Sequence, residues 1–305
     1  MLQKDSSPPS VLSLISSPSD MRKTIQGLNY WLSEHPSIIR FRWGDNQSLG
    51  SNTWAFLFVS MASYIAFSLF LHLLLALFRR RRPVPLGPIP AVHSLFMALA
   101  SATIFVGILL SAAAEIRETR WFWRRSKTPL QWLLCFPLGT RPSGRVFFWS
   151  YLFYLSRFLH MLRTFIAILR RRKLTFFRLF NHSIQLFTAF MWLEFSQSFQ
   201  VLAILSTTSV YSVVYGYRFW TQIGLRGACF PLVENCQMLA LGCNLVWHVG
   251  VFLVHFMIKG DCNGIEAWVF NSVLNCAILL LFLKFYARNM QTMKVEKTVK
   301  DNTDN

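Results

Sequence analysis

Long apolar segments separated by short polar ones dominate the chain from residue 54 onward. Each segment has about 20 residues or more, the length that an α-helix needs to cross the hydrocarbon core of a bilayer. The pattern therefore predicts an all-α, polytopic membrane protein with seven transmembrane helices. The predicted spans cover Trp54–Phe78, Ala91–Ala114, Val146–Leu169, Leu174–Leu193, Phe199–Trp220, Cys236–Ile258 and Ile265–Tyr286.

The ends of the chain differ from this membrane domain, which we place at residues 28–288. Residues 1–27 are rich in serine and proline, so we expect a disordered N-terminal extension. Residues 289–305 are polar and mildly basic, and we expect them to form a cytosolic tail.

Composition and charge support a membrane protein. Hydrophobic residues make up 53% of the chain and charged residues only 14%, which excludes an ordinary soluble enzyme, a disordered regulator and a small disulfide scaffold. The formal net charge is +18, but the basic residues cluster at the ends of apolar runs, which is typical of membrane topology rather than nucleic-acid binding.

The basic clusters also predict the topology. Arg79–Arg82 and Arg170–Lys173 directly follow the first and third spans, so the positive-inside rule places both in the cytosol. The N-terminus is then lumenal and the C-terminus cytosolic. The loop Glu115–Arg145 disagrees, because it carries seven basic residues and would be lumenal.

The cysteines favour a disulfide over a metal site. Cys135 and Cys262 fall in two predicted lumenal loops, where an oxidising compartment permits a disulfide between them. Two free thiols are the alternative, since spacing alone does not establish pairing. The sequence has no CxxC zinc pattern and its histidines are scattered, so we expect no metal.

Polar residues inside the apolar segments are candidates for chemistry, because ionisable groups are costly within a bilayer. Arg157, His160 and Thr164 are spaced i, i+3, i+7 and share one helix face, with Arg163 beside it. If the helices pack together, further polar residues line the same cavity; ordinary interhelical packing is the alternative. They are Arg178, Asn181, His182, Tyr211, Tyr215, Tyr217, Gln237 and His248.

Several segments resemble the ELO family, the very-long-chain fatty acid elongases of the endoplasmic reticulum. They are Phe147–Arg157 (FFWSYLFYLSR), Thr175–Ser183 (TFFRLFNHS), Val214–Phe219 (VYGYRF) and, similar to the plant branch, Asn29–Pro36 (NYWLSEHP). The resemblance covers the chain from about Leu28 to Arg288. It implies a seven-helix bundle enclosing an acyl-chain tunnel open to the cytosol. It also implies condensation of a long-chain acyl-CoA with malonyl-CoA to 3-oxoacyl-CoA and CO2, with no cofactor.

The catalytic motifs depart from the family pattern. The histidine box HxxHH reads Arg178-Leu179-Phe180-Asn181-His182, so only its last histidine remains. Arg178 stands where the family has its nucleophilic histidine, and a guanidinium stays protonated. In the span-three motif, His160 and Arg163 replace two acids, whereas Arg157 and Thr164 keep the basic position and the threonine.

From this resemblance we expect His182 and Asn181 to be catalytic and a second group to bind substrate. The substrate-binding candidates are Arg157, Thr164, Arg178, Tyr215, Tyr217 and Gln237, and the CoA-phosphate candidates are Arg171, Arg172 and Lys173.

Three functional hypotheses follow. The first is an elongase that uses His182, with Arg178 stabilising an anion; the second is a non-catalytic ELO-like protein that binds acyl-CoA or regulates elongases. A seven-span receptor or transporter is the third, although receptor signatures and the inverted repeats of transporters are not evident. Membrane lipid and acyl-CoA are the expected partners. The resemblance adds the reductases and the dehydratase of the elongation cycle, a homodimer, and products that feed sphingolipids and waxes.

Overall fold

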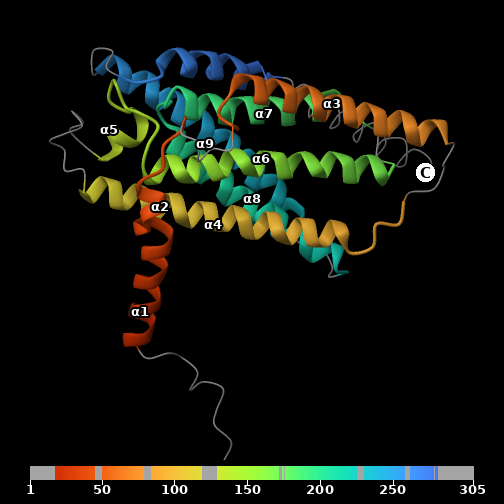
Figure 1. The fold of residues 1–305 in the computed structure, drawn as a ribbon, viewed down its shortest axis with the longest axis horizontal. Helices are drawn as coiled ribbons and strands as arrows, with labels where there is room; N and C mark the ends of the chain where they lie inside the picture. Colours follow the sequence, from red (N-terminus) through yellow and green to blue (C-terminus); the bar gives the residue numbers. More distant parts are fainter. Residues whose placement is uncertain are drawn as a thin grey trace, which may run out of the picture.

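A computed structural model describes residues 18–44, 50–78, 84–118, 129–171, 174, 176–224, 230–257, 262–277 and 279–280. Over these residues the protein is helical and contains two isolated β-bridges, Arg42–Ser143 and Pro137–Cys262, but no extended strand. Residues 265–277 are also helical. The other elements are α1 (Pro18–Asn29), the π-helix η2 (Tyr30–Glu34), α2 (Pro36–Ile39), α3 (Trp54–Leu77), α4 (Ile89–Glu118), α5 (Pro129–Leu134), α6 (Arg145–Leu169), α7 (Phe176–Glu194), α8 (Gln200–Gln222) and α9 (Phe230–Met257) (Figure 1).

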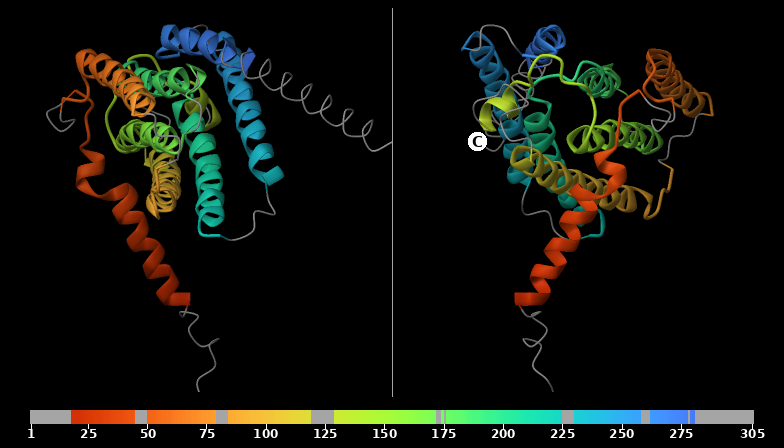
Figure 2. Two further views of the ribbon diagram at one scale, coloured as in Figure 1. Left: turned by 90° about the vertical axis from the view of Figure 1, so that its right-hand side faces the viewer. Right: turned by 60° about the vertical axis from the view of Figure 1, so that its left-hand side comes forward.

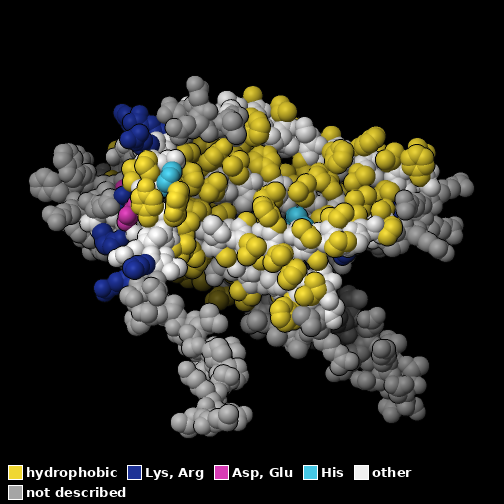
Figure 3. Space-filling view, turned by 60° about the horizontal axis from the view of Figure 1, so that its bottom comes forward, with side chains coloured by type: hydrophobic (Ala, Val, Ile, Leu, Met, Phe, Trp, Pro, Cys, Tyr) yellow, Lys and Arg dark blue, Asp and Glu magenta, His cyan; other side chains and the backbone are white. Residues whose placement is uncertain are grey.

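Among the described residues, three helices are long and apolar enough to cross a bilayer: α3, residues Ile89–Arg117 of α4, and α6. The chain is therefore a multi-pass membrane protein. Helices α7, α8 and α9 and residues 265–277 lie where we predicted the last four spans, and their crossing of the membrane stays a prediction. Hydrophobic side chains cover most of the described surface along the helices, and the visible Lys and Arg gather mainly at its left end (Figure 3).

The long helices are arranged as a closed ring. Helix α6 packs on α7 and α4, α4 packs on α8, and α8 packs on α9. Residues 265–277 complete the ring. The ring centroids of Phe270 and Phe187 of α7 are 5.7 Å apart, and Ser272 is hydrogen-bonded to His248 of α9. Helix α3 lies outside this ring against α6 and α7 (Figure 2).

The contact between α4 and α6 depends on a glycine. A Cβ atom at Gly107 would lie 2.2 Å from the indole ring of Trp149, so only glycine lets the two helices approach this closely. Trp149 is held in turn, because its Nε1 donates a hydrogen bond to the Leu32 carbonyl at 2.8 Å. The indole therefore ties the η2 segment to the bundle.

One end of the ring is crosslinked. Cys135 and Cys262 form a disulfide, with their Cα atoms 5.1 Å apart, which confirms the pairing that the predicted topology permitted. Beside it, the Asn263 amide donates to the carbonyls of Phe195 and Ser196 at 3.0 and 3.2 Å. The loop segments before α6, after α7 and before residue 265 are thus joined at one point.

A helix overlaps the end of the N-terminal extension. We predicted disorder for residues 1–27, and the structure describes α1 from Pro18 to Asn29. Proline is favoured in the first turn of a helix, and no further proline or glycine interrupts the segment before Gly27. Residues 1–17 and the predicted tail 289–305 lie outside the described residues.

Candidate functional site

A polar face of α6 is buried within the protein. Arg157, His160 and Thr164 are 3%, 3% and 0% exposed, as their spacing on one helix face predicted. The Thr164 hydroxyl is hydrogen-bonded to the hydroxyl of Tyr64 on α3 at 2.9 Å. Three polar side chains of one helix are therefore withdrawn from lipid and held inside the protein.

Arg157 carries its charge among neutral groups. Its guanidinium lies 3.8 Å from the centroid of Phe153 and 5.1 Å from that of Tyr211, and its Nη1 donates to the Gln185 Oε1 at 3.4 Å. Ring faces and an amide dipole stabilise a cation without neutralising it. The site therefore keeps a net positive charge at this point, which favours an anionic ligand or transition state.

Gln185 connects the three helices of the site, and our sequence analysis missed it. Its Oε1 accepts hydrogen bonds from Arg157 on α6 and from the Tyr211 hydroxyl on α8, the latter at 3.3 Å. Its Nε2 donates to the Asn181 Oδ1 one turn back on α7, at 3.4 Å. A polar amide one turn after the box, inside an apolar span, was the available signal.

His160 belongs to the centre, although we named it only as a polar candidate and not among the catalytic or substrate-binding residues. Its Nδ1 is hydrogen-bonded to the Tyr215 hydroxyl at 2.8 Å, and its ring lies 4.6 Å from that of Tyr211. Its Nε2 is buried and has no hydrogen-bond partner among the described residues. One imidazole nitrogen is thus positioned by Tyr215, and the other is left without a hydrogen-bond partner among the described residues.

His182, the remaining histidine of the box, lies in the same cationic environment. It is close enough to Arg157, Arg163 and Arg178 for their charges to act on its ring. Its Nδ1 is buried without a hydrogen-bond partner in the described part of the chain. A neutral imidazole with a free nitrogen can act as a nucleophile or a base.

The charge of these helices is strongly one-sided. Between Val146 and Gln222 the only acidic residue is Glu194, at the end of α7, where its carboxylate accepts a hydrogen bond from Trp43 Nε1 at 2.9 Å. The same stretch contains seven arginines. On the resemblance noted from sequence, His160 and Arg163 stand where acids that would offset part of this charge are expected.

Apart from this cluster, a polar cavity of about 280 Å³ opens between α4, α6 and α8, near the C-terminal ends of α6 and α8. Arg163, Arg170 and Arg218 line it, and no carboxylate is among its described lining residues. The guanidinium carbons of Arg163 and Arg218 lie 6.0 and 5.5 Å from the centroid of Tyr215. We call this cavity the arginine pocket, and Tyr215 links it to His160 and the interior.

The remaining residues that we predicted for the site either have other described contacts or have side chains that the structure does not describe. The Arg171 Nη2 donates to the Leu75 carbonyl near the end of α3 at 2.6 Å, so this cation has a structural bond. Tyr217 is partly buried on α8. Gln237 belongs to α9 but its side chain is not described, and Arg172 and Lys173 lie outside the described residues. No cluster of three metal-ligating side chains occurs among the described residues.

Comparison with known proteins agrees with this architecture. A sequence model described as "ELO: GNS1/SUR4 family" matches residues 49–298. The chain is 66% identical over 274 residues to "Fatty acid elongase 3-like" of Arabidopsis thaliana, covering 88% of this chain and 94% of that one. It is 25% identical over 280 residues to "Fatty acid elongase A" of Dictyostelium discoideum, covering 88% and 93%.

Proposed function

The chain belongs to the ELO family, and we propose that it is a fatty acid elongase-type acyltransferase that condenses a long-chain acyl-CoA with malonyl-CoA. The observation that carries this proposal is the cluster of histidine and arginine side chains inside a ring of membrane helices. Such a cluster combines a group able to take an acyl chain with cations able to stabilise the enolate that the reaction forms.

We place the protein in the endoplasmic reticulum membrane, with seven spans, a lumenal N-terminus and a cytosolic C-terminus. The closed ring supports an acyl tunnel along its axis, because the polar face of α6 is buried within the protein. The arginine pocket lies near the C-terminal end of α6, which the cluster Arg170–Lys173 follows in the sequence. The proposed topology places this end in the cytosol, where CoA is supplied.

The proposed chemistry has two steps. His182 attacks the acyl thioester, so that a C–N bond forms, the C–S bond breaks and CoA leaves as the thiol. Loss of CO2 from malonyl-CoA then gives an enolate, which attacks the acyl carbon and releases the imidazole. The sum is acyl-CoA plus malonyl-CoA and one proton giving 3-oxoacyl-CoA, CoA and CO2. Arg157 and Arg178 stabilise the oxyanion and the enolate, and Asn181 and Gln185 orient the cluster.

A condensation assay on the purified chain tests this proposal. With long-chain acyl-CoA and labelled malonyl-CoA, we expect labelled 3-oxoacyl-CoA and an equal amount of CO2. Folded protein that binds acyl-CoA but forms no product would instead establish a non-catalytic acyl-CoA-binding or regulatory relative. Arg178 favours that second function, because a guanidinium in place of the first box histidine cannot attack a thioester.

The arginine pocket is proposed to hold the CoA phosphates, alongside the candidates Arg171, Arg172 and Lys173. One guanidinium group can donate two parallel hydrogen bonds to a phosphate. Replacing both Arg163 and Arg218 by Gln should therefore weaken acyl-CoA binding by roughly 100-fold, or about 1.4 kcal/mol for each arginine. The measurement is the Kd of a non-hydrolysable acyl-CoA analogue at two salt concentrations. Arg141→Gln, an exposed arginine beside the disulfide-linked loop, is the control and should leave the Kd unchanged. An unaltered Kd in the double variant would remove the pocket from CoA binding.

The chemistry of the product also implies partners. A 3-oxoacyl-CoA must be reduced, dehydrated and reduced again before the next round of elongation, so reductases and a dehydratase of the same membrane are the proposed neighbours. A homodimer is proposed on family grounds.

A further inference from the structure

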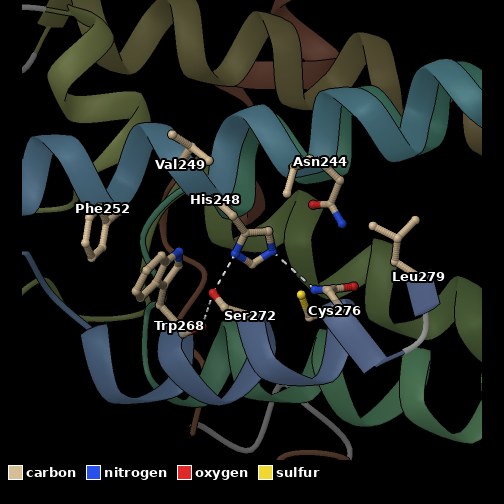
Figure 4. Close-up of a pocket in the computed structure, with 10 residues that line it drawn as sticks. Asn244, His248, Val249, Phe252, Trp268, Ser272, Cys276 and Leu279 are labelled. Carbon is tan, nitrogen blue, oxygen red and sulfur yellow. Dashed lines mark hydrogen bonds between the residues drawn. The ribbon is translucent and has the colours of Figure 1, made fainter.

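A pocket of about 270 Å³ lies between α9 and residues 268–279, and neither the histidine and arginine cluster nor the arginine pocket shares a residue with it. Figure 4 shows its polar floor, where His248 of α9 faces Ser272 and Asn244 projects into the opening. Its walls include Leu245, Val249 and Phe252. None of its described lining residues carries a carboxylate, an ammonium or a guanidinium.

The hydrogen bonds of the floor determine the tautomer of His248. The Ser272 hydroxyl donates its only proton to the Trp268 carbonyl at 2.8 Å, so it acts as acceptor toward His248 Nδ1, also at 2.8 Å. The proton of the imidazole is therefore on Nδ1, and Nε2 accepts from the Asn275 Nδ2 at 3.2 Å. Both ring nitrogens are satisfied, and His248 is a fixed, neutral part of the floor.

Asn244 differs from its neighbours because its carboxamide forms no hydrogen bond with any described residue, although it lines the pocket one turn before His248. An amide without a partner is costly at membrane depth, where water is scarce. The Asn275 Oδ1 also has no hydrogen-bond partner among the described residues. The floor thus offers amide donors and carbonyl acceptors that a ligand can satisfy.

The rim of the pocket is apolar and exposed. Leu245, Val249 and Phe252 are 53%, 49% and 49% exposed on a helix whose segment Gly242–Met257 is apolar. A ligand that enters sideways from the bilayer would place hydrocarbon on these residues and its headgroup on Asn244. Since none of the described lining residues is charged, a charged headgroup would be desolvated without compensation.

We propose that this pocket binds an uncharged single-chain lipid with an amide headgroup, whose N–H and C=O pair with the Asn244 carboxamide while its chain lies along Leu245, Val249 and Phe252. An amide supplies one donor and one acceptor, which is what a carboxamide needs. This site goes beyond the condensation reaction and does not depend on it.

Photolabelling of the full chain in nanodiscs tests the proposal. The probe is an N-alkyl fatty amide with a diazirine in its chain, and mass spectrometry locates the labelled peptides. We expect saturable labelling of residues 244–252 or 268–279, competed by the unlabelled amide. The methyl ester of the same chain, which has no donor, should compete on the order of tenfold less well, as expected for the loss of one buried hydrogen bond.

Matched variants separate the pocket from general lipid contact. Val249→Trp fills the pocket and should abolish saturable labelling, whereas Val246→Trp, on the same helix and 60% exposed but outside the pocket, should leave it intact. Asn244→Leu should lower the affinity about tenfold, and Asn244→Gln, which keeps the carboxamide, should lose less. Equal labelling of Val249→Trp and the native chain, equal competition by ester and amide, or an unchanged affinity in Asn244→Leu would each overturn the proposal. Because Asn244 lies outside the proposed reaction centre, acyl-CoA binding should be unchanged in its variants, and this also verifies that they are folded.

Discussion

Replacement of His182 by alanine is expected to lower the condensation rate by at least about 100-fold, while the affinity for acyl-CoA changes little. His182 is the only histidine left in the box, and its buried Nδ1 has no hydrogen-bond partner among the described residues. A side chain that acts as nucleophile or base contributes rate rather than ground-state binding. The measurement is single-turnover formation of 3-oxoacyl-CoA with enzyme in excess.

The control for this prediction is His72→Ala, because His72 is exposed on α3, the helix that lies outside the ring. It should keep the native rate. Full activity in His182→Ala would contradict the assignment and move the chemistry to His160, whose Nε2 is also buried without a partner in the described part of the chain. Asn181→Ala should have a smaller effect than His182→Ala, because its described contact orients Gln185.

Replacement of Gly107 by alanine is expected to destabilise the bundle by about 2 kcal/mol or more. The new Cβ would lie 2.2 to 2.4 Å from three atoms of the Trp149 indole, which is itself tied to Leu32. Alanine gains roughly 1 kcal/mol of helix propensity over glycine, but overpacking costs about 1–3 kcal/mol and more where the neighbour cannot move. The net result should be a lower thermal unfolding midpoint and less monodisperse protein in detergent.

Gly242→Ala is the matched control, since Gly242 is also inside a helix but a Cβ there would have no atom within 4 Å. It should unfold at the native temperature or slightly above it. An unfolding midpoint for Gly107→Ala equal to that of Gly242→Ala would show that α4 and α6 do not approach each other as closely as described.

Some residues of the site could be predicted from the sequence, and others could not. The shared face of Arg157, His160 and Thr164 followed from spacing alone, because helical periodicity is a local property of the chain. Gln185 was missed, because its role depends on Arg157 and Tyr211 arriving from two other helices. Arg163 and Arg218 were not recognised as a pair either, since 55 residues separate them and only the packing of α6 beside α8 brings both to Tyr215.

The sequence by itself determined the membrane class, the places of the helices and the clustering of basic residues at the ends of apolar segments. These properties depend on hydropathy, on charge and on residue identity, each of which is read from short stretches of chain. Only the tertiary structure decided that six helical segments among the described residues close into a ring, that Cys135 reaches Cys262, and that Asn244 has no partner within it. Those outcomes depend on contacts between distant segments, where packing selects one arrangement among many that the same local pattern permits.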